Sequence, residues 1–177
     1  MSIEQFVAQS EGQWRSMRSA HSLAFRQFED VISNIMIERL PADSQELVNF
    51  LLSVPIIPGT ISSPFQMTWE AESDWEPDDP TAVSQGTCFL VPIPQTKRTG
   101  LLMRSKGYAE SEAVMSSYSF LDDGTFILKS VYGQSIAEER IWFLSEHVRC
   151  RSSVLRTSEG AGILQTSFSS EVKRLAT

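Results

Sequence analysis

The chain has 177 residues, of which 41% are hydrophobic, and it carries a net charge of −7 at pH 7. That length and composition predict one domain with one core, spanning residues 1–177. The 15 basic residues are scattered along an acidic chain, which disfavours nucleic acid as a partner. No apolar run is long enough to cross a membrane, and the N-terminus lacks the pattern of a secretion signal. We therefore expect a cytoplasmic protein with no membrane partner.

Cysteine and histidine are too few and too dispersed to suggest a metal site. Cys88 and Cys150 lie far apart and form no CxxC motif, which is typical of reduced thiols rather than of a disulfide framework. With only His21 and His147 in addition, the sequence predicts no metal and no permanent cofactor. We expect both thiols to be packing residues rather than nucleophiles.

A short helix and two long strands are predicted at the N-terminal end. Residues 3–10 place apolar side chains at helical spacing, and Gly12 ends the pattern, which predicts a short helical lid. Aromatic and β-branched residues then alternate, imperfectly, with polar ones over residues 13–25 and 26–40. This alternation favours two strands.

A second helix is predicted directly after these strands. Asp43 precedes Glu46 by three residues, a pair that resembles a capping box at a helix N-terminus. Pro55 stops the pattern. Apolar residues at helical spacing between them are Leu47, Phe50, Leu51 and Val54.

The remainder of the chain reads as short strands separated by turns rich in glycine, proline and aspartate. The expected strands are 67–73, 87–92, 101–105, 113–121, 125–131, 135–144, 148–156 and 163–172. The chain is thus mainly β, and about ten strands in a meander predict a closed antiparallel up-and-down barrel, because closure removes exposed edges. Such a barrel can hold one elongated ligand. The acidic, proline-containing loop at 74–80 is expected at its mouth.

One predicted hairpin carries charged residues on the face that we expect to point inward. In an extended chain Arg149, Arg151 and Ser153 share one face. A turn near Ser145 would pair residues whose numbers sum to about 290, which places Glu139 opposite Arg151 and diagonal to Arg149. Burying such a cluster costs desolvation energy unless the charges pair or meet a charged ligand, so it is the first candidate site. The alternative is a solvated outer strand face.

Three segments resemble the S-type phycobiliprotein lyases, the CpcS/CpeS group. They are residues 11–26 (EGQWRSMRSAHSLAFR), 138–143 (EERIWF) and 149–153 (RCRSS). The resemblance spans nearly the whole chain and implies a ten-stranded lipocalin-like or fatty-acid-binding-protein-like barrel. It also implies binding of an open-chain tetrapyrrole, typically phycocyanobilin. The implied activity is that of a lyase, which joins this bilin through a thioether to a cysteine of an apo-phycobiliprotein.

The resemblance assigns pocket residues one by one. The family's acidic and two basic residues fall on Glu139, Arg149 and Arg151, with Ser153 on the same face. Further matches at the pocket or its rim are Arg18, Met67, Trp69 and Trp75. The arginines would bind the bilin propionates as planar, bidentate donors. Glu139 would accept pyrrole N–H groups and favour the protonated, more electrophilic bilin, which makes it the catalytic candidate.

Two classes of function stay open at this point. The first is the bilin lyase, whose implied partners are apo-subunits of the phycocyanin or allophycocyanin type, with a homodimer or a heterodimer with a paralogue left open. The second is a carrier of a bilin, a haem-like ligand or a fatty acid that catalyses nothing. Glu139 beside the arginines would repel a fatty-acid carboxylate and so favours the bilin. Trp142 alternates away from Glu139, toward the outer face or a partner contact.

Overall fold

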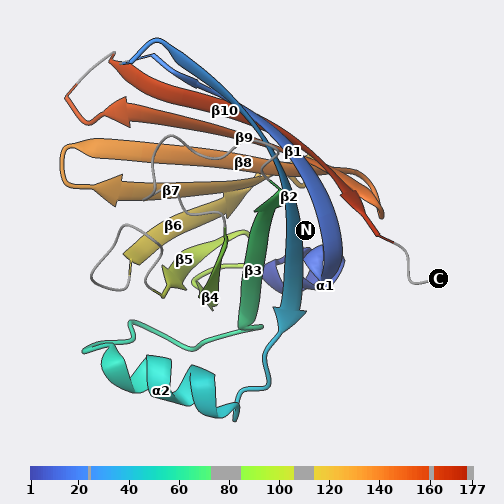
Figure 1. The fold of residues 1–177 in the computed structure, drawn as a ribbon. Helices are drawn as coiled ribbons and strands as arrows, with labels where there is room; N and C mark the ends of the chain where they lie inside the picture. The colour runs from blue at the N-terminus through green and yellow to red at the C-terminus, as the bar shows by residue number, and fades with distance from the viewer. Residues whose placement is uncertain (24, 73–84, 106–113, 160–161, 175–177) are drawn as a thin grey trace.

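The structure is a computed structural model that describes residues 1–23, 25–72, 85–105, 114–159 and 162–174. Within these residues ten antiparallel strands close into a barrel, as predicted, and the order around the barrel follows the chain until β1 pairs with β10 (Figure 1). None of the described helices is long and apolar enough to cross a membrane. The strands are β1 (Gly12–Ser22), β2 (Gln27–Arg39), β3 (Phe65–Glu72), β4 (Gln85–Pro94), β5 (Thr99–Arg104), β6 (Val114–Phe120), β7 (Phe126–Tyr132), β8 (Ser135–Ser145), β9 (Val148–Thr157) and β10 (Ile163–Lys173).

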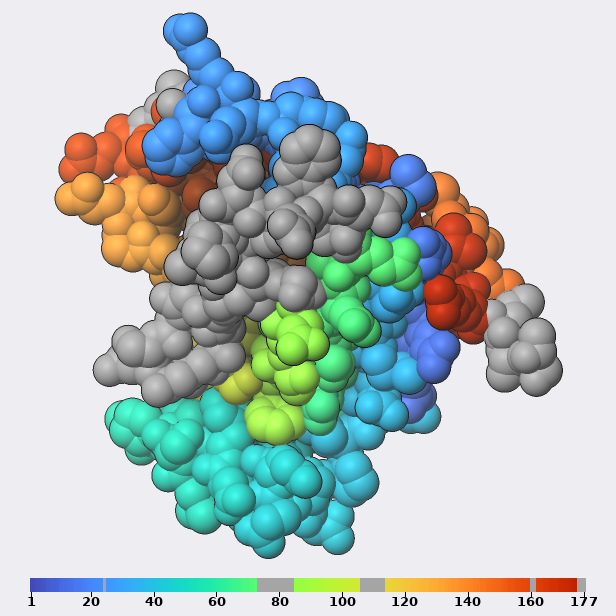
Figure 2. Space-filling model, in the orientation of Figure 1, coloured from blue at the N-terminus to red at the C-terminus, as the bar shows by residue number. Residues whose placement is uncertain are grey.

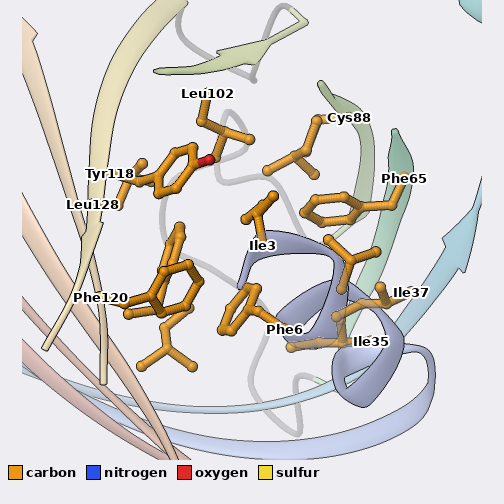
Figure 3. Packing of buried hydrophobic residues seen from close by; sticks show 14 of the residues in the cluster. Ile3, Phe6, Ile35, Ile37, Phe65, Cys88, Leu102, Tyr118, Phe120 and Leu128 are labelled. Atoms are coloured by element: carbon orange, nitrogen blue, oxygen red, sulfur yellow. The ribbon is translucent and has the colours of Figure 1, made fainter. Parts of the chain in front are cut away.

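Helix α1 (Ile3–Ser10) closes one end of the barrel. A capping box starts it, because the Ser2 hydroxyl accepts from the Gln5 amide and the Gln5 side chain accepts from the Ser2 amide. The Phe6 ring stacks on Phe126 with 4.4 Å between centroids. Figure 3 shows Ile3 and Phe6 pointing into a ring of buried side chains that the strands contribute. Apolar burial of this kind holds the helix in place as the floor of the barrel.

Helix α2 (Gln45–Ser53) packs outside the barrel, at the same end. Its Leu47 is fully buried against Val91 and Met103, whose side chains point outward from β4 and β5. In Figure 2, α2 and the segment after it form the lower end of the molecule. The predicted cap is wrong. Ser44, not Asp43, is the N-cap, and its side chain makes no capping hydrogen bond, so burial of Leu47 rather than a capping box positions this helix.

The interior follows strict alternation of side chains along the strands. Inward positions are even-numbered in β1 and odd-numbered in β8, β9 and β10, as the residues around the central cavity show. The β1–β2, β7–β8 and β9–β10 turns all lie at the end opposite α1. That end forms the mouth of the barrel.

Candidate functional site

The barrel encloses a cavity of about 920 Å³. Small-molecule pockets usually measure roughly 300–1,000 Å³, so this one suits a large ligand. It extends from Phe6 of α1 to Phe28 beside the β1–β2 turn, where the side chain is 58% exposed. The wall formed by β8, β9, β10 and β1 carries Arg18, Glu139, Arg149, Arg151 and Glu171. Further charged lining residues come from β2, β3 and β5, namely Glu29, Asp30, Glu72 and Arg104.

The sequence-predicted residues that the structure describes all line this cavity. They are Arg18, Met67, Trp69, Glu139, Arg149, Arg151 and Ser153. Trp75 and the acidic loop at 74–80 lie outside the described residues. Trp142 lies on the outer face, as expected, with its ring 6.1 Å from that of Phe168.

The predicted register of the β8–β9 hairpin is wrong: each β8 residue pairs with the β9 residue two positions later than expected. Glu139 lies opposite Ser153, and Ile141, not Glu139, lies opposite Arg151. The reason is that the turn lies at Glu146 and His147, with Ser145 paired to Val148, later in the chain than the expected centre at Ser145. Glu139 is therefore one inward position nearer the mouth than Arg151 and two nearer than Arg149.

The ion-pair partner of Arg149 is Glu171 on β10, a residue that the sequence interpretation missed. The Arg149 Nε donates to Glu171 Oε2 at 2.5 Å, and each of the two side chains is only 1% exposed. The Ser16 hydroxyl on β1 donates to the other oxygen, Glu171 Oε1, at 3.3 Å. We call Arg149, Arg151 and Glu171 the deep cluster.

A signal for Glu171 was present in the sequence. The turn at residues 158–162 is centred on residue 160, and a hairpin about that centre pairs Arg149 with Glu171, which is the register observed. Alternation also places Ser167, Ser169 and Glu171 on one face of β10.

Trp14 ties the deep cluster to the floor of the barrel. The guanidinium carbon of Arg149 lies 4.4 Å from the centroid of the buried Trp14 ring, a cation–π contact. The Trp14 indole N–H donates to the carbonyl of Ser10, at the end of α1, at 2.8 Å. The ammonium of Lys173 lies 4.9 Å from the same ring and donates to the carbonyl of Gln9. These contacts hold Arg149 rigidly with respect to α1.

Electrostatics keep the deep cluster charged. Burial would raise the pKa of Glu171, but Arg151 and Arg149 outweigh burial and hold this pKa below its ordinary value. Burial also opposes the charge of Arg151, yet Glu171 and then Glu139 raise the pKa of its guanidinium. Burial lowers the pKa of Arg149 and Glu171 opposes this, but an arginine stays protonated in proteins. Glu171 is thus a carboxylate at neutral pH, between two cations.

Both arginines retain buried donors without a partner. Within the described part of the chain, Arg149 Nη2 and Arg151 Nε make no hydrogen bond although no solvent reaches them. A buried donor of a charged group is costly to leave unpaired. Because both side chains line the cavity, an anionic ligand group is the partner that would satisfy them.

Arg18 and Trp69 occupy other parts of the wall. Arg18 pairs with Glu29 at 3.1 Å near the mouth, where the two side chains are 39% and 59% exposed, so it is a rim residue. Trp69 on β3 lies across Gly86 of β4, where a Cβ would approach the indole to 2.2 Å. Gly86 therefore permits the indole ring to lie flat against the wall.

Comparison with known proteins agrees with this architecture. The family model described as CpeS-like protein matches residues 2–174. Chromophore lyase CpcS/CpeS 3 of Trichodesmium erythraeum is 44% identical over 175 residues, which cover 98% of this chain and 99% of that protein. The chain belongs to the CpcS/CpeS chromophore lyases.

Two further relatives of this chromophore lyase bear on its fold and its ligand. A protein of Microchaete diplosiphon with the provisional name phycoerythrobilin lyase CpeS is 44% identical over 161 residues, covering 89% of this chain and 71% of that protein. The S-type phycobiliprotein lyase CPES from Guillardia theta, a solved structure, superposes with a TM-score of 0.82 at 35% identity. The superposition includes 100% of the present chain and 95% of the Guillardia theta chain. The barrel is thus shared with an S-type lyase of known structure.

Proposed function

We propose that this chromophore lyase binds an open-chain tetrapyrrole in the barrel and joins it through a thioether to a cysteine of an apo-phycobiliprotein. The observation that carries the proposal is a cavity of about 920 Å³ lined by Arg149 and Arg151, two arginines that each keep a buried donor without a partner. A bilin carries propionates, which match these donors, and flat rings, which match the wall around Met67 and Trp69.

Glu139 is the candidate for activation. Its side chain lines the cavity and makes no hydrogen bond or ion pair with any described residue, so its oxygens are open to a ligand. A carboxylate at this position accepts pyrrole N–H groups and stabilises the protonated tetrapyrrole. Protonation makes the exocyclic ethylidene carbon more electrophilic, and a carboxylate already in place stabilises that charge as the thiol approaches.

The transfer step needs only the bilin and the acceptor thiol. The sulfur bonds to the ethylidene carbon, the exocyclic double bond is consumed, and the thiol proton ends on the tetrapyrrole, so nothing leaves. Cys88 and Cys150 of the lyase are buried thiols, and burial raises the pKa of Cys150, which disfavours its nucleophilic thiolate. The lyase therefore holds the bilin without a covalent bond.

Phycocyanobilin is the proposed substrate, with subunits of the phycocyanin or allophycocyanin type as acceptors. Phycoerythrobilin is the second candidate, because a relative at 44% identity is named for it. Both bilins carry the propionates that the deep cluster selects, so the choice between them depends on the wall around Met67 and Trp69.

The test is to mix the purified chain with each bilin and an apo-subunit, and to follow attachment by zinc-enhanced fluorescence on a denaturing gel. Attachment to a wild-type acceptor, and none to an acceptor whose cysteine is replaced by serine, would support the proposal. Binding of bilin with no acceleration of attachment over a lyase-free reaction would instead make the chain a carrier.

A further inference from the structure

The deep cluster carries less positive charge than its two arginines suggest. Glu171 lies within it as a built-in anion, so two cations and one anion leave a net charge of +1. Resting on the proposed function, we infer that Glu171 limits the deep cluster to one propionate and directs the other propionate to the mouth of the barrel. Glu171 is thus a residue that sets how the bilin is oriented.

The geometry shows that Glu171 is a fixed part of the wall. One of its oxygens accepts from Arg149 Nε and the other from the Ser16 hydroxyl, and its side chain is 1% exposed. Trp14 holds the Arg149 guanidinium from the side of α1. A ligand therefore meets an arginine whose Nε is already used by Glu171, while the Nη2 of Arg149 and the Nε of Arg151 are buried without a partner.

Charge balance decides between one propionate and two. One ligand carboxylate brings the deep cluster to neutrality and gives the unpartnered donors an acceptor. A second would leave an uncompensated negative charge far from solvent, which costs several times what a hydrogen bond returns. The deep cluster therefore binds one propionate.

The next charge along the wall reinforces this orientation. Glu139 lies opposite Ser153, one step nearer the mouth than Arg151. A carboxylate there repels a second propionate and attracts the protonated tetrapyrrole rings. The second propionate then lies beyond Glu139, toward the rim where Arg18 and Glu29 meet solvent.

The experiment uses the wild-type chain and esters of phycocyanobilin. Dissociation constants are measured for the free acid, for each of the two monomethyl esters separately, and for the dimethyl ester. One monoester should bind within about twofold of the free acid, whereas the other monoester and the dimethyl ester should each bind at least about tenfold more weakly.

Two results would overturn the inference. Equal weakening by the two monoesters would mean that both propionates are buried, and equal binding of the free acid and the dimethyl ester would mean that neither is. A wild-type chain that binds no free-acid bilin would overturn the proposed function as well. If the free acid binds normally and either of the first two results is found, only the inference about Glu171 is overturned.

Variants test Glu171 itself. Glu171→Gln keeps an oxygen for the Arg149 Nε but raises the net charge of the deep cluster, so it should bind the free acid about tenfold more tightly. Glu171→Asp keeps the charge and should retain the wild-type difference between the two monoesters. Glu11→Gln, which removes the partner of Arg39 on the outer surface, is the matched control and should bind as wild type does. Glu171→Gln binding no more tightly than wild type would show that Glu171 does not set the charge of the site.

Discussion

Replacing Arg149 or Arg151 by methionine should affect the free energy of unfolding and the ligand affinity to different extents. Arg149→Met leaves Glu171 without its direct partner, at 1% exposure. Removing one member of a buried pair costs about 3–5 kcal/mol, and the contact with Trp14 is lost as well. Arg151 remains close enough to Glu171 to offset part of this penalty, so we expect the lower end, about 3 kcal/mol.

Arg151→Met should behave differently, because the Arg149–Glu171 pair persists without it. The Arg151 Nε has no partner in the ligand-free protein, so we expect a loss of only about 1 kcal/mol in the free energy of unfolding. Its bilin affinity should fall by roughly 1.5–3 kcal/mol, the value of a charge-assisted hydrogen bond, which is about ten- to hundredfold in Kd.

Urea unfolding of the ligand-free proteins and fluorescence titration with bilin measure the two quantities. Arg98→Met is the matched control, since Arg98 pairs with the exposed Asp122 away from the cavity and should change neither. Equal destabilisation by Arg151→Met and Arg149→Met, or wild-type bilin affinity in Arg151→Met, would refute these separate roles of the two arginines.

Three other outcomes follow from the same geometry. Glu139→Gln should lose more in single-turnover transfer rate than in affinity, and the absorption of the bound bilin should shift to shorter wavelength; normal rate and spectrum would leave Glu139 a structural residue. The double variant Cys88→Ser, Cys150→Ser should transfer bilin as wild type does, and failure of the folded variant on the denaturing gel would indicate a covalent intermediate. The folded-state pKa of Glu171 lies below its ordinary value of 4.5, so its stabilising contribution is complete above that pH and is lost as the pH falls through the lower value. The free energy of unfolding, measured from neutral to acid pH, should therefore decrease less steeply for Glu171→Gln than for wild type.

Side-chain alternation made much of the site predictable from the sequence. Arg149, Arg151 and Ser153 share a face because the period of an extended chain is two, whatever its neighbours are. The same rule put Trp142 outside, and the recurrence of turns predicted ten strands and a closed barrel. The floor is only partly predictable, since the spacing of residues 3–10 predicts a helix but not its packing on Phe126.

Contacts between strands depend on register, which the tertiary structure decides. The turn at Glu146 and His147 lies later than the expected centre at Ser145, so Glu139 lies opposite Ser153 instead of Arg151, and a displacement of two residues leaves each face intact.

The partners of Arg149 also depend on which strands meet, over longer distances along the chain. Glu171 reaches it through the β9–β10 pairing, and Trp14 reaches it only because β10 closes the barrel on β1. Each face is set by local backbone geometry, but an ion pair requires two distant segments to meet in one register. The turn at residues 158–162 already indicates the pairing of Arg149 with Glu171, but the contact with Trp14 requires closure of the barrel, which only the tertiary structure decides.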